Sequence, residues 1–222
     1  FHKLTWLGRV DWKPVSKVML YASISRGYRA GGYSIQAAST VYPTQSALDA
    51  AFTPFKPEVV DNYEVGFKSD LIHHRLRVNG SFYYQNYKNI QAQIRDFVNN
   101  TVITLIRNAA SAKPYGAELE VTGQVTPQWI VNASAGYLHA SYDKYFARDS
   151  AGNLLDLSSL AFPAPKFTAN FGTTYTIPVG PGSLKLNANV AYLSKVNFRP
   201  GPAQDDASLT QPKYALVDAR IS

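Results

Sequence analysis

The joins between the strand-like stretches of this chain are alternately very short and long. The short joins are Pro14–Ser16, Ser69–His74, Pro127–Gln128 and Pro178–Gly182. The long and mostly polar joins between them are Gly27–Pro57, Asp96–Arg107, Asp143–Pro165 and Arg199–Pro212. A sheet with tight turns at one rim and long loops at the other is typical of a β-barrel that crosses a membrane.

The stretches between the joins alternate in polarity with a period of two residues. In the segment Phe167–Ile177, the residues Phe167, Phe171 and Tyr175 fall on one face and Asn170 falls on the other. The segments 75–91, 115–126 and 184–192 alternate in the same way. Because successive strand residues point to opposite sides of a sheet, this period predicts strands with one apolar and one polar face.

Nine strands follow from this reading, and no helical periodicity stands out. Their expected bounds are Leu4–Lys13, Lys17–Arg26, Glu58–Lys68, Arg75–Gln91, Tyr115–Thr126, Trp129–Tyr145, Phe167–Ile177, Leu184–Tyr192 and Lys213–Ser222. A soluble β-sandwich also alternates, but its strands are usually about 5–6 residues long. The predicted fold class is all-β: a portion of an antiparallel transmembrane β-barrel with short periplasmic turns and long extracellular loops.

The composition agrees with a membrane β-barrel and argues against a protein that crosses the membrane with helices. Apolar residues make up 45% of the chain, yet no run approaches the ~18–20 continuous apolar residues of a transmembrane helix. Aromatic residues are abundant, with 15 Tyr and 11 Phe, and they are expected in two interfacial belts. Trp12 and Trp129 are beside short turns, and the opposite belt is expected to contain Tyr84, Tyr87, Tyr137, Tyr142 and Tyr192.

Charge and cysteine content narrow the candidate partners. The net charge of +7 favours anionic partners, but the 22 basic residues are spread without a cluster, so nucleic acid is not expected. Anionic lipopolysaccharide and an anionic solute are the other candidates, and charge alone does not choose between them. For a membrane barrel, outer-membrane lipid and lipopolysaccharide are the expected surroundings. The absence of cysteine excludes disulfides and thiolate metal sites.

Three segments resemble the TonB-dependent outer-membrane receptors of the siderophore-receptor type. Ser23–Tyr33 (SISRGYRAGGY) resembles the strand end and Gly-aromatic-Arg-Ala turn of that family. Phe55–Lys68 is similar to its Lys-Pro-Glu…Tyr-Glu-x-Gly-x-Lys strand, and Tyr115–Glu120 to its Gly-x-Glu-x-Glu strand. The three motifs occur in the family's order, and the resemblance covers essentially the whole chain.

The resemblance implies a barrel of ~22 strands that encloses an N-terminal plug. Residues 1–222 would supply a C-terminal part of that barrel, and both chain ends are expected to be cuts. The plug, the segment that contacts TonB, the early strands and the closing strands would then lie outside this sequence.

Two groups of side chains are the candidate sites. Basic and aromatic residues at the long-loop rim are expected to bind ligand, because Arg holds oxygen anions and Tyr stacks or donates: Tyr28, Arg29, Tyr33, Arg95, Arg107, Tyr142 and Arg199. Residues expected to face the lumen or the plug are Glu64, Lys68, Glu118 and Glu120. Glu58, Glu64 and Lys68 are expected to pair with one another or with the plug, since Glu64 and Lys68 share a face.

The predicted function is uptake of a scarce solute across the bacterial outer membrane, energised through TonB, with a ferric siderophore as the expected ligand. Haem, cobalamin and carbohydrate receptors share the barrel. A passive porin-like channel and a soluble β-rich binding module are the alternatives. Enzymatic activity is not expected, because no catalytic constellation or metal-ligand cluster is present at a workable spacing, and no cofactor is expected.

Overall fold

The computed structural model describes residues 2–34, 44–98, 101–148, 153–160, 162–198 and 209–222. Its elements in chain order are β1 (Trp6–Val15), β2 (Val18–Arg29), α1 (Gln45–Ala51), β3 (Glu58–Leu71), β4 (Leu76–Val98), β5 (Thr101–Ala112), β6 (Tyr115–Thr126), β7 (Trp129–His139), β8 (Tyr142–Arg148), β9 (Leu154–Asp156), β10 (Phe167–Val179), β11 (Gly182–Leu193), β12 (Val196–Asn197), β13 (Thr210–Gln211) and β14 (Tyr214–Ile221). No helix among the described residues is long and apolar enough to cross a membrane.

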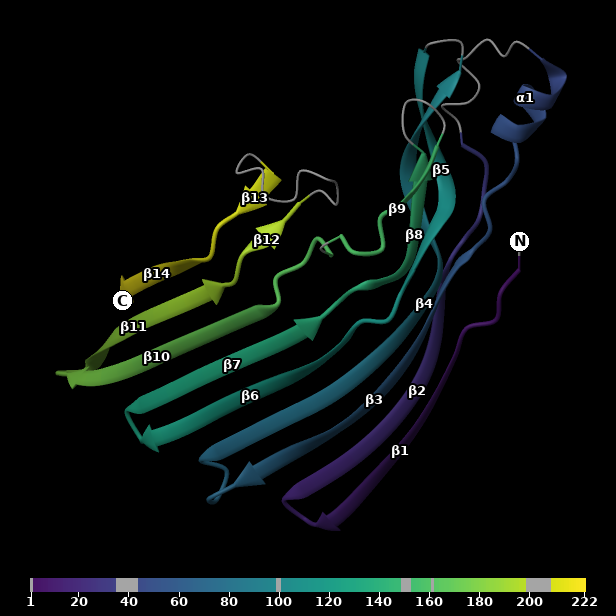
Figure 1. Cartoon of the computed structure of the whole chain (residues 1–222). Helices are drawn as coiled ribbons and strands as arrows, with labels where there is room; N and C mark the ends of the chain where they lie inside the picture. The colour runs from purple at the N-terminus through teal and green to yellow at the C-terminus, as the bar shows by residue number, and fades with distance from the viewer. Residues whose placement is uncertain (1, 35–43, 99–100, 149–152, 161, 199–208) are drawn as a thin grey trace.

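Nine long strands form one curved wall. Neighbours pair antiparallel in the order β1-β2-β3-β4-β6-β7-β10-β11-β14 (Figure 1). These are the nine strands that the sequence predicts. The turns at 16–17, 72–75, 127–128 and 180–181 are short and lie at one end of the wall, which we call the short-turn end. The opposite end is the long-loop end.

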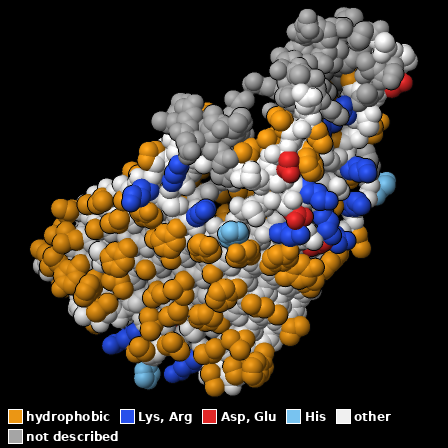
Figure 2. Space-filling view, viewed as in Figure 1, with side chains coloured by type: hydrophobic (Ala, Val, Ile, Leu, Met, Phe, Trp, Pro, Cys, Tyr) orange, Lys and Arg blue, Asp and Glu red, His pale blue; other side chains and the backbone are white. Residues whose placement is uncertain are grey.

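One face of the wall is apolar and exposed. Register places Val10, Val65 and Phe82 on this outer face, where they are 71%, 54% and 64% exposed. Figure 2 shows this broad hydrophobic surface. The buried apolar side chains of the described residues are few and mostly lie near the long-loop end: Ala51, Val59, Leu105, Ala110, Ala112, Leu160 and Val196. A soluble sheet would cover its apolar face, so the sandwich alternative does not fit.

Aromatic rings border the outer face at the long-loop end. The rings of Tyr63 and Tyr84 lie 6.2 Å apart, those of Phe167 and Tyr192 lie 6.1 Å apart, and Tyr115 stacks on His139. This confirms the predicted placement of Tyr84 and Tyr192 and is the arrangement expected at a membrane interface. The prediction for Tyr87 was wrong, because its register partner Val60 lies on the polar inner face.

The predicted loop Asp96–Arg107 is instead a strand hairpin. β4 passes through a bulge near Asn89, where φ is 56°, and then pairs with β5 beyond the wall. Residues 101–104 (TVIT) are all β-branched, which favours extended backbone. The resulting extension of β4, β5 and β8 rises above the long-loop end in Figure 1.

Two further differences concern the long joins. The predicted strand Trp129–Tyr145 divides into β7 and β8, because β6 begins at Tyr115 opposite His139 and offers no partner beyond it; β8 pairs with β5 instead. The short helix α1 within the first long join was not predicted.

Candidate functional site

The inner face carries a chain of polar contacts across the first three strands. Arg9 donates from Nε to Asp11 at 2.8 Å and places its guanidinium 4.2 Å from the centre of the Tyr21 ring. The Tyr21 hydroxyl donates to Glu64 Oε1 at 2.5 Å. This chain fixes Glu64, one of the predicted lumenal residues, at the long-loop half of the inner face.

Of the two partners expected for Glu64, Lys68 is out of reach along the strand, and the plug remains a prediction. Residues four apart share a face in a strand, but at about 3.3 Å of rise per residue their backbones lie roughly 13 Å apart. Lys68 is instead in register with Met19 and Asn79, one row nearer the short-turn end than Gly66. The Glu58 carboxylate accepts a hydrogen bond from the backbone N–H of Gln91 at 2.9 Å.

Glu118 and Glu120 lie on the inner face of β6, the face that we expect to meet the lumen. Their register partners on β4 are Ser81 and Asn79, and both residues are exposed on the described face. Glu118 also lines a hollow of about 410 Å³ together with Glu64, Tyr83 and Tyr87. The structure therefore brings Glu64 and Glu118 to one polar hollow below the long-loop rim.

Two glycines explain why the Tyr-Glu-x-Gly and Gly-x-Glu segments have this form. A Cβ on Gly66 would lie 2.7 Å from the Tyr21 ring and 2.6 Å from the Gly80 carbonyl oxygen. A Cβ on Gly116 would lie 2.5 Å from the Tyr83 hydroxyl. The Tyr21 ring therefore packs against the backbone at Gly66, and the Tyr83 ring packs against the backbone at Gly116. In this position the Tyr21 hydroxyl reaches Glu64.

The predicted rim residues lie in different environments. Arg29 pairs in register with Glu58 near the end of the wall, and Tyr33 is exposed beyond it. Arg107 on β5 donates from Nη1 to the Thr53 carbonyl oxygen at 3.1 Å. Tyr28 shares the outer face, since its register partner is Val59. The Arg95 side chain and the whole of Arg199 fall outside the described part of the chain.

Tyr142 packs within the extension. Its ring lies 4.8 Å from that of Tyr145 and 5.1 Å from that of Phe162. Burial, with a smaller contribution from Tyr145, raises the pKa of the Tyr142 hydroxyl to about 12. Tyr142 therefore stays neutral and helps to hold β8 in place.

A polar clamp that the sequence reading missed fixes the first long join to the β4–β5 hairpin. The Asn108 side chain accepts from the Lys56 amide at 2.6 Å and donates to the Lys56 and Asn89 carbonyl oxygens, both at 2.8 Å. Gln91 Nε2 donates to the Ala30 carbonyl oxygen at 2.8 Å. Side-chain amides opposite backbone groups leave no periodic signal, so only the fold reveals them.

Gly31 allows the same join to pass close to Phe55. A Cβ there would collide with the Phe55 carbonyl oxygen, and the neighbouring Gly32 exchanges two backbone hydrogen bonds with Phe55, at 3.1 and 2.8 Å. The beginning and the end of the first long join are thus held together at Gly32 and Phe55. Among the described residues, no cluster of three or more His, Cys, Asp or Glu could hold a metal ion.

Comparison with known proteins assigns this architecture to a family. The family model described as TonB dependent receptor-like, beta-barrel matches residues 1–222. The Ferric-pyoverdine 358 receptor of Pseudomonas putida is 26% identical over 221 residues, which is 95% of this chain and 25% of that protein.

Two crystal structures show the same fold. The ferric yersiniabactin uptake receptor FyuA of Yersinia pestis has a TM-score of 0.68 at 20% identity and covers 97% of this chain, which matches 29% of FyuA. The siderophore receptor PiuA of Acinetobacter baumannii also has a TM-score of 0.68, at 23% identity, over 97% of this chain and 28% of PiuA. The chain spans about a quarter of the length of the curated relatives it matches. It belongs to the TonB-dependent receptor β-barrel family, whose members are outer-membrane proteins of Gram-negative bacteria.

Proposed function

We propose that this chain is part of the barrel wall of an outer-membrane receptor that takes up a ferric siderophore with energy relayed through TonB. The observation that carries the proposal is the match of the whole chain to this receptor family, together with relatives whose names specify ferric siderophores. The exposed apolar outer face and the polar inner face suit a wall between lipid and a filled lumen.

The rest of the receptor supplies the plug, the remaining strands and the contact with TonB. Glu118 and Glu120 present carboxylates to the lumen, and Lys68 adds a cation on the same face. Plug donors would satisfy these groups, because charged side chains in a lumen need partners. Glu64 is already held by Tyr21 and offers its second oxygen.

Ligand capture occurs at the long-loop rim. Arg29, Tyr33 and Arg107 lie in or beside the segments that the clamp holds together, and Arg95 and Arg199 belong to the same rim in sequence. Arginine binds the oxygen atoms of carboxylate-, catecholate- or hydroxamate-type ligands through charge-assisted hydrogen bonds. Transport is non-covalent, so no residue here acts as a catalyst. Tyr142 contributes through packing.

The test uses the full-length receptor in its own bacterium. Deleting its gene should abolish uptake of at least one radiolabelled ferric siderophore from a panel of pyoverdine-type, catecholate and hydroxamate complexes. Restoring the gene should restore uptake, and deleting TonB should abolish it again. Uptake that persists without TonB would overturn the proposal. Steady ion conduction by the purified full-length protein in a planar bilayer would support the porin-like alternative instead.

A further inference from the structure

A pocket at the long-loop end lies between the ends of β7, β10 and β11 and the join that leads from β9 to β10. Its volume is about 560 Å³, which is in the range of small-molecule sites. Figure 1 shows this join running to the start of β10 beyond the long-loop end of β7. None of the ligand residues expected from the sequence is among the described residues that line the pocket. The pocket is therefore a separate candidate site.

Hydrogen bonds at the strand ends hold one side of this pocket. The backbone N–H of Leu138 donates to the Lys166 carbonyl oxygen at 2.9 Å, which extends the pairing of β7 with β10 by one residue. The backbone N–H of Ser194 donates to the Phe167 carbonyl oxygen at 2.9 Å. In return, the backbone N–H of Phe167 donates to Ser194 Oγ at 2.9 Å. The backbone of Lys166 and the hydroxyl of Ser194 are therefore fixed at the end of β10.

The join from β9 to β10 forms the other side of the pocket and is itself held in place. The backbone N–H of Leu157 donates to the Tyr145 carbonyl oxygen at 2.7 Å, which ties the join to β8. Leu160 is buried, and the Phe162 ring lies 5.1 Å from the Tyr142 ring. Because both sides are fixed by contacts within the chain, a ligand would meet a preformed pocket and little ordering would oppose its binding.

The side chains that line the pocket suit an anion. Among the described residues that line it, none carries a carboxylate, and the lining includes two cations with several hydroxyl and amide groups: Lys166, Lys195, Ser141, Ser159, Ser194 and Asn197. Because the Ser194 oxygen accepts from a backbone N–H, its own O–H remains a donor. Asp156 on the same join accepts from the backbone N–H of Ser158 at 2.9 Å and does not line the pocket. Ammonium and hydroxyl donors together hold oxygen anions through charge-assisted hydrogen bonds.

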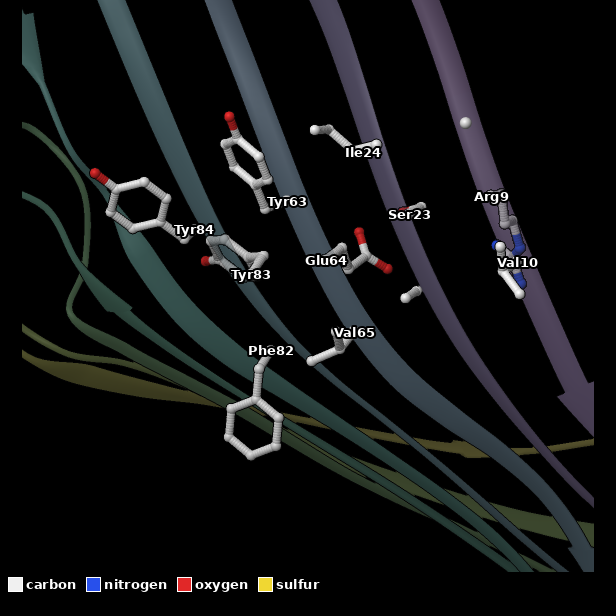
Figure 3. Close-up of a pocket in the computed structure, with 12 residues that line it drawn as sticks. Arg9, Val10, Ser23, Ile24, Tyr63, Glu64, Val65, Phe82, Tyr83 and Tyr84 are labelled. Carbon is white, nitrogen blue, oxygen red and sulfur yellow. The ribbon is translucent and has the colours of Figure 1, made fainter. Parts of the chain in front are cut away.

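The neighbouring hollow on the inner face has the opposite charge. Leu138 and Phe162 line both spaces, so the two adjoin. The hollow contains the carboxylates of Glu64 and Glu118, and none of the described residues that line it is Lys or Arg. Figure 3 shows Glu64 beside Tyr83, its register partner on β4. An anion is therefore attracted to the lysine pocket and repelled by the hollow next to it, which favours the rim as its binding position.

We propose that the pocket binds a free carboxylate of the ferric complex that the receptor takes up, through Lys166 and Lys195. This inference rests on the proposed function, because it takes the ligand to be a ferric siderophore. The hydroxamate or catecholate oxygens of such a complex coordinate the iron, so a carboxylate is the anionic group left for the protein. A lysine ammonium is a compact charge and matches a compact anion. The receptor thus selects ferric siderophores with an uncoordinated carboxylate over neutral hydroxamate complexes.

The experiment measures binding of two iron-55 complexes to the full-length receptor in detergent. One is a ferric hydroxamate siderophore with a free carboxylate, and the other is the same siderophore with that group converted to a carboxamide. The unchanged receptor should bind the carboxylate complex about 100-fold more tightly, because two charge-assisted contacts contribute about tenfold each. Lys166→Gln and Lys195→Gln should each lower this ratio to about tenfold, and the double variant should abolish it. Lys144→Gln, an equal charge change on β8 outside the pocket, is the control and should keep the full ratio.

The ratio of the two affinities separates selectivity from folding. It is measured only on receptors that bind, so a partly misfolded preparation lowers the amount of both complexes bound and leaves the ratio unchanged. Equal affinity of the unchanged receptor for the two complexes would overturn the proposal. An unchanged ratio in the double variant, or an equal fall in Lys144→Gln, would overturn it as well. TonB-dependent uptake of a ferric siderophore by the bacterium would stand in each case, so failure of this inference is distinguishable from failure of the proposed function.

Discussion

Replacing Asn108 by Ala should release the first long join from the β4–β5 hairpin. The substitution removes three hydrogen bonds, one accepted from the Lys56 amide and two donated to the Lys56 and Asn89 carbonyl oxygens. Each contributes about 1 kcal/mol net. The side chain is half-buried and water replaces part of the loss, so we expect about 2 kcal/mol in total. That difference raises the local opening equilibrium about 30-fold.

Hydrogen–deuterium exchange of the full-length receptor measures this opening. The informative amides are those of Gly32 and Phe55, because they bond to each other rather than to Asn108 and report whether the join itself opens. Their exchange should accelerate about 30-fold in Asn108→Ala. The control is Gln45→Ala, which removes the Gln45–Asp49 hydrogen bond within α1, the one contact of this side chain given by the part of the chain that the structure describes. Unchanged exchange at Gly32 and Phe55 would show that other contacts hold the join and would refute the clamp.

Two further predictions concern packing and ionisation. Gly66→Ala should destabilise the barrel by about 1–3 kcal/mol, because its Cβ would press on the Tyr21 ring and the Gly80 carbonyl oxygen; urea unfolding in detergent measures this, and stability equal to the unchanged receptor would contradict it. In the folded protein the raised pKa keeps the Tyr142 hydroxyl neutral, whereas in an unfolded chain this hydroxyl ionises near its ordinary pKa of 10.0. The contribution of Tyr142 to the free energy of unfolding is therefore constant below pH 10.0 and falls as the pH rises toward about 12. The ultraviolet difference between the receptor and its Tyr142→Phe variant should show tyrosinate only near pH 12, and a midpoint near 10.0 would contradict the burial.

The wall could be predicted from sequence because its physical cause is local. A strand between lipid and a polar lumen alternates in polarity at every residue, so the sequence of a segment such as Phe167–Ile177 predicts both the strand and which of its residues lie on each face. The extension could not be predicted in this way, because neither of its faces meets lipid. Its only local signals are the β-branched run at 101–104 and Asn89, whose left-handed φ marks the bulge.

The inner site was predictable in part for a related reason. Alternation places Glu64, Glu118 and Glu120 on one face, but it does not say which groups meet across strands. The Tyr21–Glu64 contact depends on a register that joins residues 43 positions apart, and the Asn108–Lys56 contact joins residues 52 apart. Lys68 is out of reach of Glu64 because side-chain neighbours in a sheet lie on adjacent strands rather than along one strand, which leaves the plug as the predicted partner.

The alternation in β3 also makes the outer and inner faces of this strand depend on one register. Tyr63 and Val65 lie on the outer face, while Glu64 between them accepts a hydrogen bond from the Tyr21 hydroxyl on the inner face. A slip of one residue would turn Glu64 toward lipid and the Tyr63 ring toward the lumen. Gly66 opposes that slip, because only a residue without a Cβ fits beneath the Tyr21 ring. The tight turn at 72–75, with Ile72, His73 and His74 all at positive φ, fixes the same register from the short-turn end. One glycine and one turn therefore secure the lipid-facing and lumen-facing chemistry of this strand together.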